Sequence, residues 1–150
     1  MPVRILVING PNLNMLGRRE AKHYGTGTLE AIESMLSERG KELGCECAFF
    51  QSNHEGAIID FIQEAATDAD GILINPGALT HYGYSLHDAL VDSGLPVVEV
   101  HLSDIHARET WRRISVLADV SIRQIAGFKA QSYSLGLEAL VEHIRSQETN

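Results

Sequence analysis

Residues 3–8 read Val-Arg-Ile-Leu-Val-Ile, and residues 9–25 continue with Asn-Gly-Pro-Asn-Leu-Asn-Met-Leu-Gly-Arg-Arg-Glu-Ala-Lys-His-Tyr-Gly. The first run is mainly apolar and β-branched, which predicts a strand covered on both faces. A strand normally reaches the next helix through a short connection, whereas this one is long and dense in Gly, Asn and Arg. Because long loops at the carboxyl ends of strands commonly form binding sites or lids, this segment is the first candidate for function.

Strand-like and helix-like patterns alternate along the rest of the chain. Apolar residues at helical spacing predict a helix that begins after Thr28 and ends at Gly44, and they predict later helices at about 56–66, 84–93, 107–117 and 132–144. Short apolar runs predict strands at 45–50, 71–74, 96–100 and 120–126. Arg123 interrupts the last run, so we expect an edge strand there. We expect residues 146–150 to be frayed.

This alternation predicts the fold class. Five strands separated by helices indicate a parallel sheet with right-handed crossovers. We therefore predict one domain over residues 1–150, an α/β fold of the flavodoxin-like, three-layer kind, with a five-stranded parallel sheet in the order 2-1-3-4-5 and helices on both faces.

Composition limits the function classes. The net charge of −8 comes without a stripe of Lys and Arg, which argues against nucleic acid as a partner, although a local pocket can still be cationic. No apolar stretch approaches membrane-spanning length and no signal-peptide pattern is present, so we expect no membrane association and a cytoplasmic location. Cys45 and Cys47 are two positions apart in a predicted strand, so both side chains point to the same side, where we expect them to pack as small apolar residues. Free thiols fit a reducing compartment.

Polar residues gather where the predicted strands end, and ligands of such sheets bind beyond the carboxyl ends of the strands. Four separate segments contribute them. They are Asn9 and Asn12 after the first strand, Gln51, Ser52, Asn53 and Glu55 after the second, Asn75 and His81 after the third, and Glu99, His101, Ser103 and Arg112 at or after the fourth.

Motifs for common cofactors are absent. The chain has no dinucleotide-binding or P-loop glycine pattern and no nucleophile elbow. His101, Asp104 and His106 could suggest a metal site, but groups of this kind also cap and hydrogen-bond at the junction between a strand and a helix. The two histidines are five residues apart, which is not the spacing of a helical ligand pair, so we expect no metal.

Two pairs of residues suggest proton chemistry on a small anion. A guanidinium from Arg18 or Arg19 would favour the phenolate of Tyr24, whose ordinary pKa is about 10, although a tyrosine in a loop could simply pack its ring on the surface. Glu99 lies two positions before His101 on the same strand face, so its carboxylate could orient the ring and favour imidazolium. His101 could equally be a hydrogen-bonded junction residue.

Taken together, these motifs resemble the family of type II 3-dehydroquinate dehydratases over nearly the whole chain. The matching segments are residues 9–17, Arg19-Glu20, Tyr24-Gly25, residues 51–56, residues 74–78, Thr80-His81, residues 99–103 and residues 105–109. The resemblance implies a flavodoxin-like subunit that assembles as a dodecamer of four trimers. It also implies anti elimination of water from 3-dehydroquinate to 3-dehydroshikimate through an enolate, without metal or cofactor.

The same resemblance implies roles for the catalytic residues. Tyr24 is the base that removes the C2 proton, Arg19 lowers its pKa, and both lie on a lid of about residues 18–26. His101 is the acid that protonates the departing C1 hydroxyl, and Glu99 orients it.

It further implies a fifth catalytic residue and the binding residues. Asn12 is the fifth catalytic residue, because it helps to hold a water near the enolate oxygen. Asn75 and Ser103, with the backbone N–H groups of Leu102 and Ser103, bind the substrate carboxylate. The remaining three are His81 and Arg112, which bind ring hydroxyls, and Asp88, which reaches the site of a neighbouring subunit.

Several positions depart from the usual family pattern, and they keep two alternatives open. Leu79, Tyr82 and Asp104 favour a divergent relative that acts on another cyclic polyol acid. The second alternative is a non-catalytic protein of the same fold that binds a small anion. Other departures are Ala21, Thr110, Asp119, Arg123, Lys129 and Ser132, the last four in the most divergent segment, residues 115–133.

Overall fold

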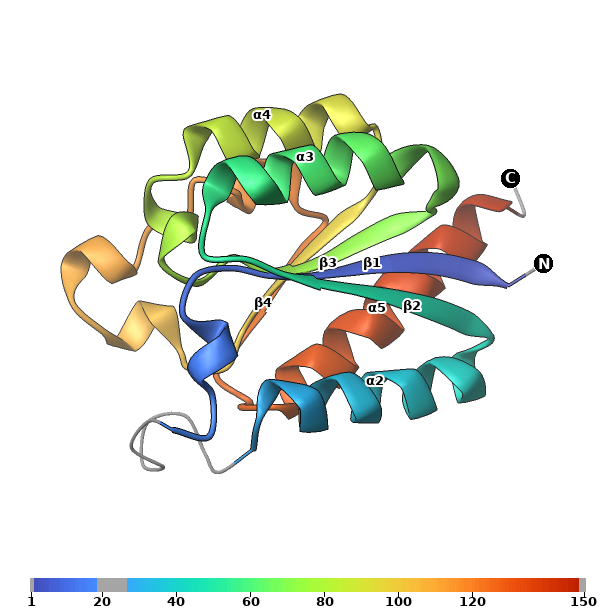
Figure 1. Cartoon of the computed structure of the whole chain (residues 1–150), viewed down its shortest axis with the longest axis horizontal. Helices are drawn as coiled ribbons and strands as arrows, with labels where there is room; N and C mark the ends of the chain where they lie inside the picture. The colour runs from blue at the N-terminus through green and yellow to red at the C-terminus, as the bar shows by residue number, and fades with distance from the viewer. Residues whose placement is uncertain (1, 19–26, 149–150) are drawn as a thin grey trace.

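Five parallel strands form one sheet in the order β2-β1-β3-β4-β5, which confirms the order expected from the sequence. The computed structural model describes residues 2–18 and 27–148, and Figure 1 shows its layers. The strands are β1 (Val3–Asn9), β2 (Cys45–Gln51), β3 (Gly71–Asn75), β4 (Val97–His101) and β5 (Arg123–Ala126). Every residue of β3 and β4 is buried, as expected for central strands of a sheet covered on both faces.

Helices cover both faces of this sheet. Figure 1 shows α2 (Leu29–Leu43) and α5 (Gln131–Glu148) on one face and α3 (Glu55–Ala65) and α4 (Tyr84–Ser93) on the other. Helix α2 begins and ends where the sequence predicts. The Thr28 hydroxyl accepts a hydrogen bond from the N–H of Ala31 at 3.1 Å, and Gly44 takes the left-handed conformation with φ of 72°.

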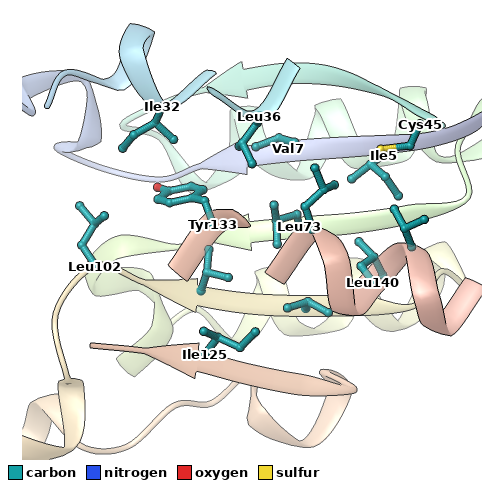
Figure 2. Packing of buried hydrophobic residues seen from close by; sticks show 14 of the residues in the cluster. Ile5, Val7, Ile32, Leu36, Cys45, Leu73, Leu102, Ile125, Tyr133 and Leu140 are labelled. Atoms are coloured by element: carbon teal, nitrogen blue, oxygen red, sulfur yellow. The ribbon is translucent and has the colours of Figure 1, made fainter. Parts of the chain in front are cut away.

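Two apolar layers hold the helices to the sheet. Figure 2 shows part of the first layer, in which Tyr133 of α5 lies among the side chains of α2 and the strands. Ile58 and Ile62 of α3 and Leu86 and Leu90 of α4 form the second layer with the opposite faces of β1 and β3. The sheet is therefore packed on both faces, and the carboxyl ends of its strands carry the polar residues.

Residues 107–117 differ from the helix expected there. This part of the chain has 3-10 turns at Ile105–Ala107 and Thr110–Arg112, and residues 107–117 contain no α-helix. The reason is tertiary, because backbone groups further along this segment bond to another part of the chain. The N–H of Val116 donates to the carbonyl of Thr80 at 2.7 Å, so the segment turns toward the sheet instead of continuing as a helix.

The last strand and the last helix also differ in their bounds. A 3-10 turn occupies Ala118–Val120, so β5 begins only at Arg123, and it lies at the edge of the sheet as expected. Residues 146–148 belong to α5, where the Ser146 hydroxyl donates to the carbonyl of His143 at 2.7 Å. The rest of the segment expected to be frayed, residues 149–150, lies outside the described residues. Of the helices in residues 2–18 and 27–148, none is both long and apolar enough to cross a membrane.

Candidate active site

A pocket of about 370 Å³ opens at the carboxyl ends of β1, β3 and β4. The turns that follow these strands lie together at the left of Figure 1. Strand register explains the convergence, since Asn9 pairs with both Gln51 and Asn75 and so places three strand ends at one level. The sequence-predicted site residues that line the pocket are Asn12, Asn75, His81, His101, Leu102, Ser103 and Arg112.

A buried carboxylate orients the histidine of this pocket. Nε2 of His101 lies 2.5 Å from Oε2 of Glu99, so the contact suggested by their spacing is present. Glu99 has no exposed surface and His101 is 5% exposed. Because Nε2 faces the carboxylate, Nδ1 is the ring nitrogen that remains for a ligand.

Three further side chains, none of them singled out from the sequence for this purpose, surround Glu99. Thr80 donates its hydroxyl to Oε2, Ser115 donates its hydroxyl to Oε1 at 2.8 Å, and Nε2 of Gln124 donates to Oε1 at 3.2 Å. Burial raises the pKa of Glu99, but the hydrogen bond and charge of His101 and the two hydroxyls outweigh it, and the pKa is below its usual value. Glu99 is thus held as a carboxylate.

A second buried network fixes Asn75. The phenol of Tyr133, which is fully buried, donates to Oδ1 of Asn9 at 2.6 Å and accepts from Nδ2 of Asn75 at 2.9 Å. Burial raises the pKa of Tyr133, so the phenol stays protonated. Oδ1 of Asn75 accepts the N–H of Gly77 at 3.1 Å. Sequence reasoning missed Tyr133, because a tyrosine on an apolar helix face carries no local signal of the polar partners that it meets.

An aromatic residue that sequence reasoning also missed lines the mouth of the pocket. The ring of Trp111 meets His81 edge-on with centroids 5.3 Å apart, and the guanidinium carbon of Arg112 lies 4.0 Å from the centroid of the same ring. Nε of Arg112 also forms an ion pair with Glu109 at 2.5 Å. Nδ1 of His81 lies 2.7 Å from the carbonyl of Ile114, so Nδ1 donates and Nε2 is the nitrogen available to a ligand.

The polar residues after β2 support the loop rather than the pocket. Asn12 adopts φ of 71°, and its N–H donates to Oδ1 of Asn53 at 2.9 Å. The same oxygen accepts from Nε2 of Gln51 at 3.2 Å. Glu55 accepts the N–H of Leu86 at 3.0 Å and so joins the starts of α3 and α4.

Two predicted site residues fall outside what the structure describes, and a third is remote from the pocket. Tyr24 and Arg19 lie in residues 19–26, outside the described residues, as does most of the segment 18–26. Asp88 is on α4, where its carboxylate lies 3.0 Å from Nδ1 of His87. The role of Asp88 in a neighbouring subunit stays a prediction.

The three positions that favoured a divergent relative lie outside the lining of the pocket. Leu79 is buried in the core, Tyr82 is exposed, and Asp104 accepts the N–H of His106 at 3.0 Å as the cap of a turn. None of them belongs to the residues that line the pocket. Within residues 2–18 and 27–148, no group of three or more His, Cys, Asp or Glu side chains is arranged to hold a metal ion.

The charges of the pocket determine what it can bind. Arg108, Arg112 and His81 line it together with His101, although the protein as a whole carries a net charge of −8. A local concentration of cationic and N–H donors on an acidic protein favours a small anion over a polyanion. A histidine held against a buried carboxylate is suited to proton transfer.

Comparison with known proteins identifies the family that the sequence motifs resemble. The sequence model of the family described as dehydroquinase class II matches residues 3–141. A Roseiflexus castenholzii protein described as 3-dehydroquinate dehydratase is 54% identical over 139 residues, which cover 93% of this chain and 88% of that protein.

Solved structures of similar sequence have the same fold. The type II dehydroquinase of Butyrivibrio crossotus matches with a TM-score of 0.89 at 47% identity and covers 93% of this chain and 97% of its own. That of Propionibacterium acnes also has a TM-score of 0.89, at 42% identity, covering 95% and 98%.

The fold and the site define a flavodoxin-like α/β enzyme with an anion pocket at the carboxyl edge of its sheet. Within that class, the chain belongs to the class II dehydroquinase family. The family model spans nearly the whole chain, and relatives with about 50% sequence identity match it over almost its full length.

Proposed function

We propose that this chain is a hydro-lyase that eliminates water from 3-dehydroquinate to give 3-dehydroshikimate, in aromatic amino acid biosynthesis by the shikimate pathway or in quinate breakdown. Membership of the dehydroquinase family supports the reaction. The structural observation that best supports the proposed reaction is the buried Glu99–His101 pair. His101 of this pair lines a pocket that also contains cationic side chains and N–H donors.

The reaction needs a base and an acid. The C2 proton beside the ketone is weakly acidic, so its removal needs an activated base and stabilisation of the enolate that forms. We assign the base to Tyr24, with Arg19 favouring its phenolate. His101 then gives its proton to the C1 hydroxyl, which leaves as water while the C1–C2 double bond forms. The proton held by Tyr24 passes to solvent, and His101 takes one up, so both groups are restored.

The remaining pocket residues hold the substrate in this proposal. Asn75, whose amide is fixed by Tyr133, binds the carboxylate with Ser103 and the N–H groups of Leu102 and Ser103. Nε2 of His81 and the guanidinium of Arg112 bind ring hydroxyls. The orientation of His81 supports its role, since its Nδ1 is already engaged by a carbonyl.

We also propose that the protein works as a cytoplasmic homo-oligomer, a dodecamer built from trimers, with Asp88 completing the site of a neighbouring subunit. The surface of α4 supports an interface. Tyr84 and Val91 are 69% and 53% exposed, and they are four and three residues from Asp88, so the three share one face of the helix. Exposed apolar residues gathered on one face mark interaction surfaces.

Ultraviolet absorbance after addition of 3-dehydroquinate tests the activity, since the product is a conjugated enone carboxylate. We expect a rise in absorbance with the native chain and almost none with Tyr24→Phe, and near-normal activity of that variant would disprove the base assignment. His101→Ala is expected to block dehydration more than exchange of the C2 proton. Equal loss of both would contradict a separate acid role.

Binding measured in parallel separates the two alternatives. Trp111 is the only tryptophan of the chain and lines the pocket, so its fluorescence reports a ligand there. A fluorescence change without absorbance change would indicate a binding protein. Neither change with 3-dehydroquinate would favour a relative that acts on a different cyclic polyol acid.

A further inference from the structure

The Glu99–His101 pair has two ways to hold its shared proton. With the proton on His101, the pair is imidazolium and carboxylate. With the proton on Glu99, both groups are neutral, and a neutral imidazole is a far weaker acid. Burial by itself favours the neutral arrangement, because charges lose their hydration there. Glu99 has no exposed surface, so other contacts must decide where the proton resides.

Those contacts are donors aimed at the carboxylate. Oε1 of Glu99 accepts from Ser115 at 2.8 Å and from Gln124 at 3.2 Å, and Ser115 is also 3.0 Å from Oε2. A donor stabilises a carboxylate more than a carboxylic acid. Each of them therefore moves the proton of the pair toward His101, which faces the pocket.

Neither residue touches the pocket, so both must act through Glu99. Gln124 arrives from the edge strand, where β5 pairs it directly with Glu99 of β4. Ser115 lies on a different segment, the one that carries Trp111 and Arg112. Its oxygen accepts the N–H of Leu117 at 3.1 Å, which fixes the hydroxyl in place.

From this geometry we infer that Ser115 and Gln124 are positioning residues that keep the shared proton on His101 and so keep it an acid. The inference rests on the proposed function for its effect on turnover. It also predicts a property of the pair itself that can be measured without substrate.

The variants are Ser115→Ala and Gln124→Met, which remove one donor each while keeping the approximate shape. In each we expect kcat for dehydration to fall by about tenfold, as for a lost hydrogen bond to a charged group, with KM within about twofold. Exchange of the C2 proton should continue. Ser115→Thr, which retains the hydroxyl, should restore most of the activity.

The pH profile separates this role from a merely structural one. Without a donor the neutral arrangement gains population, so the pair as a whole holds its proton to higher pH. In the plot of kcat against pH, the alkaline limb reports loss of this proton. In the variants we expect that limb to move to higher pH while the plateau value of kcat falls. A structural defect would lower the plateau and leave the limb in place.

Two controls match these variants. Ser121→Ala removes a hydroxyl that donates to the carbonyl of Leu117 at 2.8 Å, away from Glu99, and Gln63→Met changes an exposed position of α3. Both should leave turnover and the pH limb unchanged. Circular dichroism checks folding, and the two test variants lie on different segments, so a folding failure of one leaves the other informative.

Infrared difference spectroscopy of the substrate-free protein, assigned with Glu99→Gln, gives the independent readout. We expect a carboxylate band for Glu99 in the native chain and a growing carboxylic acid band in Ser115→Ala and Gln124→Met. Carboxylate bands and an unmoved pH limb in both variants would overturn the inference. If the native chain failed to dehydrate 3-dehydroquinate, the proposed function would fall, while the infrared result would still decide where the proton resides.

Discussion

Nε2 of His101 and Oε2 of Glu99 lie 2.5 Å apart at the end of β4, with the carboxylate fully buried and the imidazole at the wall of the pocket. The two residues are separated by one position on a strand, so their side chains point to the same face. The contact makes Glu99 the group that fixes the orientation of the ring, and a carboxylate beside an imidazole favours the imidazolium form over the neutral form.

Replacing Glu99 by Gln should therefore remove the acid while keeping the shape of the site. A neutral amide does not stabilise imidazolium, so we expect kcat to fall by roughly 10²–10⁴, the range for loss of general acid catalysis. Steady-state dehydration and isotope exchange at C2 measure the effect. A variant that lost exchange and dehydration to the same extent would show that Glu99 serves substrate binding instead.

Tyr133→Phe tests the network that holds Asn75. The change leaves Oδ1 of Asn9 and one N–H of Asn75 without a partner in a buried site, which costs about 1–3 kcal/mol of unfolding free energy for an unsatisfied group. We also expect KM to rise, because the amide is no longer fixed. Urea unfolding and steady-state kinetics measure the two effects, and Tyr84→Phe at an exposed position should change stability little.

Lys129→Gly should stabilise the protein. Lys129 has φ of 54°, a left-handed conformation that costs a side-chain-bearing residue about 1–2 kcal/mol. Part of this gain is offset by the greater freedom of glycine in the unfolded chain, so we expect a net increase of about 0.5–1 kcal/mol. Lys129→Ala keeps the Cβ and should give no such increase. Thermal and urea unfolding of both variants decide the matter.

The pH dependence of stability should reveal an ion pair on the surface of α4. The hydrogen bonds that His87 donates to Asp119 and, with a smaller effect, to Asp88 raise the pKa of His87, and the same bond to Asp119 lowers the pKa of that carboxyl. A raised histidine pKa stabilises the fold below the unfolded value of about 6.5, and the effect is lost as pH rises through the folded value. The lowered Asp119 pKa stabilises above about 3.9, and that effect is lost as pH falls through its folded value.

The difference in unfolding free energy between the native chain and His87→Gln should therefore be largest between about pH 4 and 6.5 and should shrink at alkaline pH. Urea unfolding across this range measures it. A difference that did not vary with pH would mean that the contacts of His87 with Asp88 and Asp119 are not ion pairs in solution. His54→Gln, at the residue that precedes α3, serves as the matched control, in which no such pH-dependent difference is expected.

Local patterns were sufficient for most of the secondary structure. The Thr28 cap, the Gly44 stop and the largely apolar central strands are determined by nearby residues, so their positions could be predicted from the sequence. The helix expected at 107–117 was wrong because the backbone of that segment bonds to Thr80 and His81, which lie more than thirty positions away. A periodic pattern carries no information about such long-range partners.

Some residues of the candidate site could likewise be predicted from the sequence, and others could not. Asn75, His81 and His101 could be chosen from the sequence because each follows a predicted strand, and the carboxyl ends of parallel strands meet at one edge. Ser115, Gln124 and Tyr133 could not, since a serine in a loop, a glutamine on an edge strand and a tyrosine on an apolar helix face look ordinary in isolation. Their importance comes from the oxygen or nitrogen atoms that they meet.

The sequence by itself determined the alternation of strands and helices and the polar residues at the carboxyl edge of the sheet, because hydrophobic periodicity and strand direction are properties of short segments. The order of the strands was expected only from the fold class that this alternation indicates. Only the tertiary structure decided that Glu99 accepts from four side chains and that Tyr133 joins Asn9 to Asn75. The physical reason is that a buried polar group must find a partner, and which partner it finds depends on packing and register across elements distant in the chain.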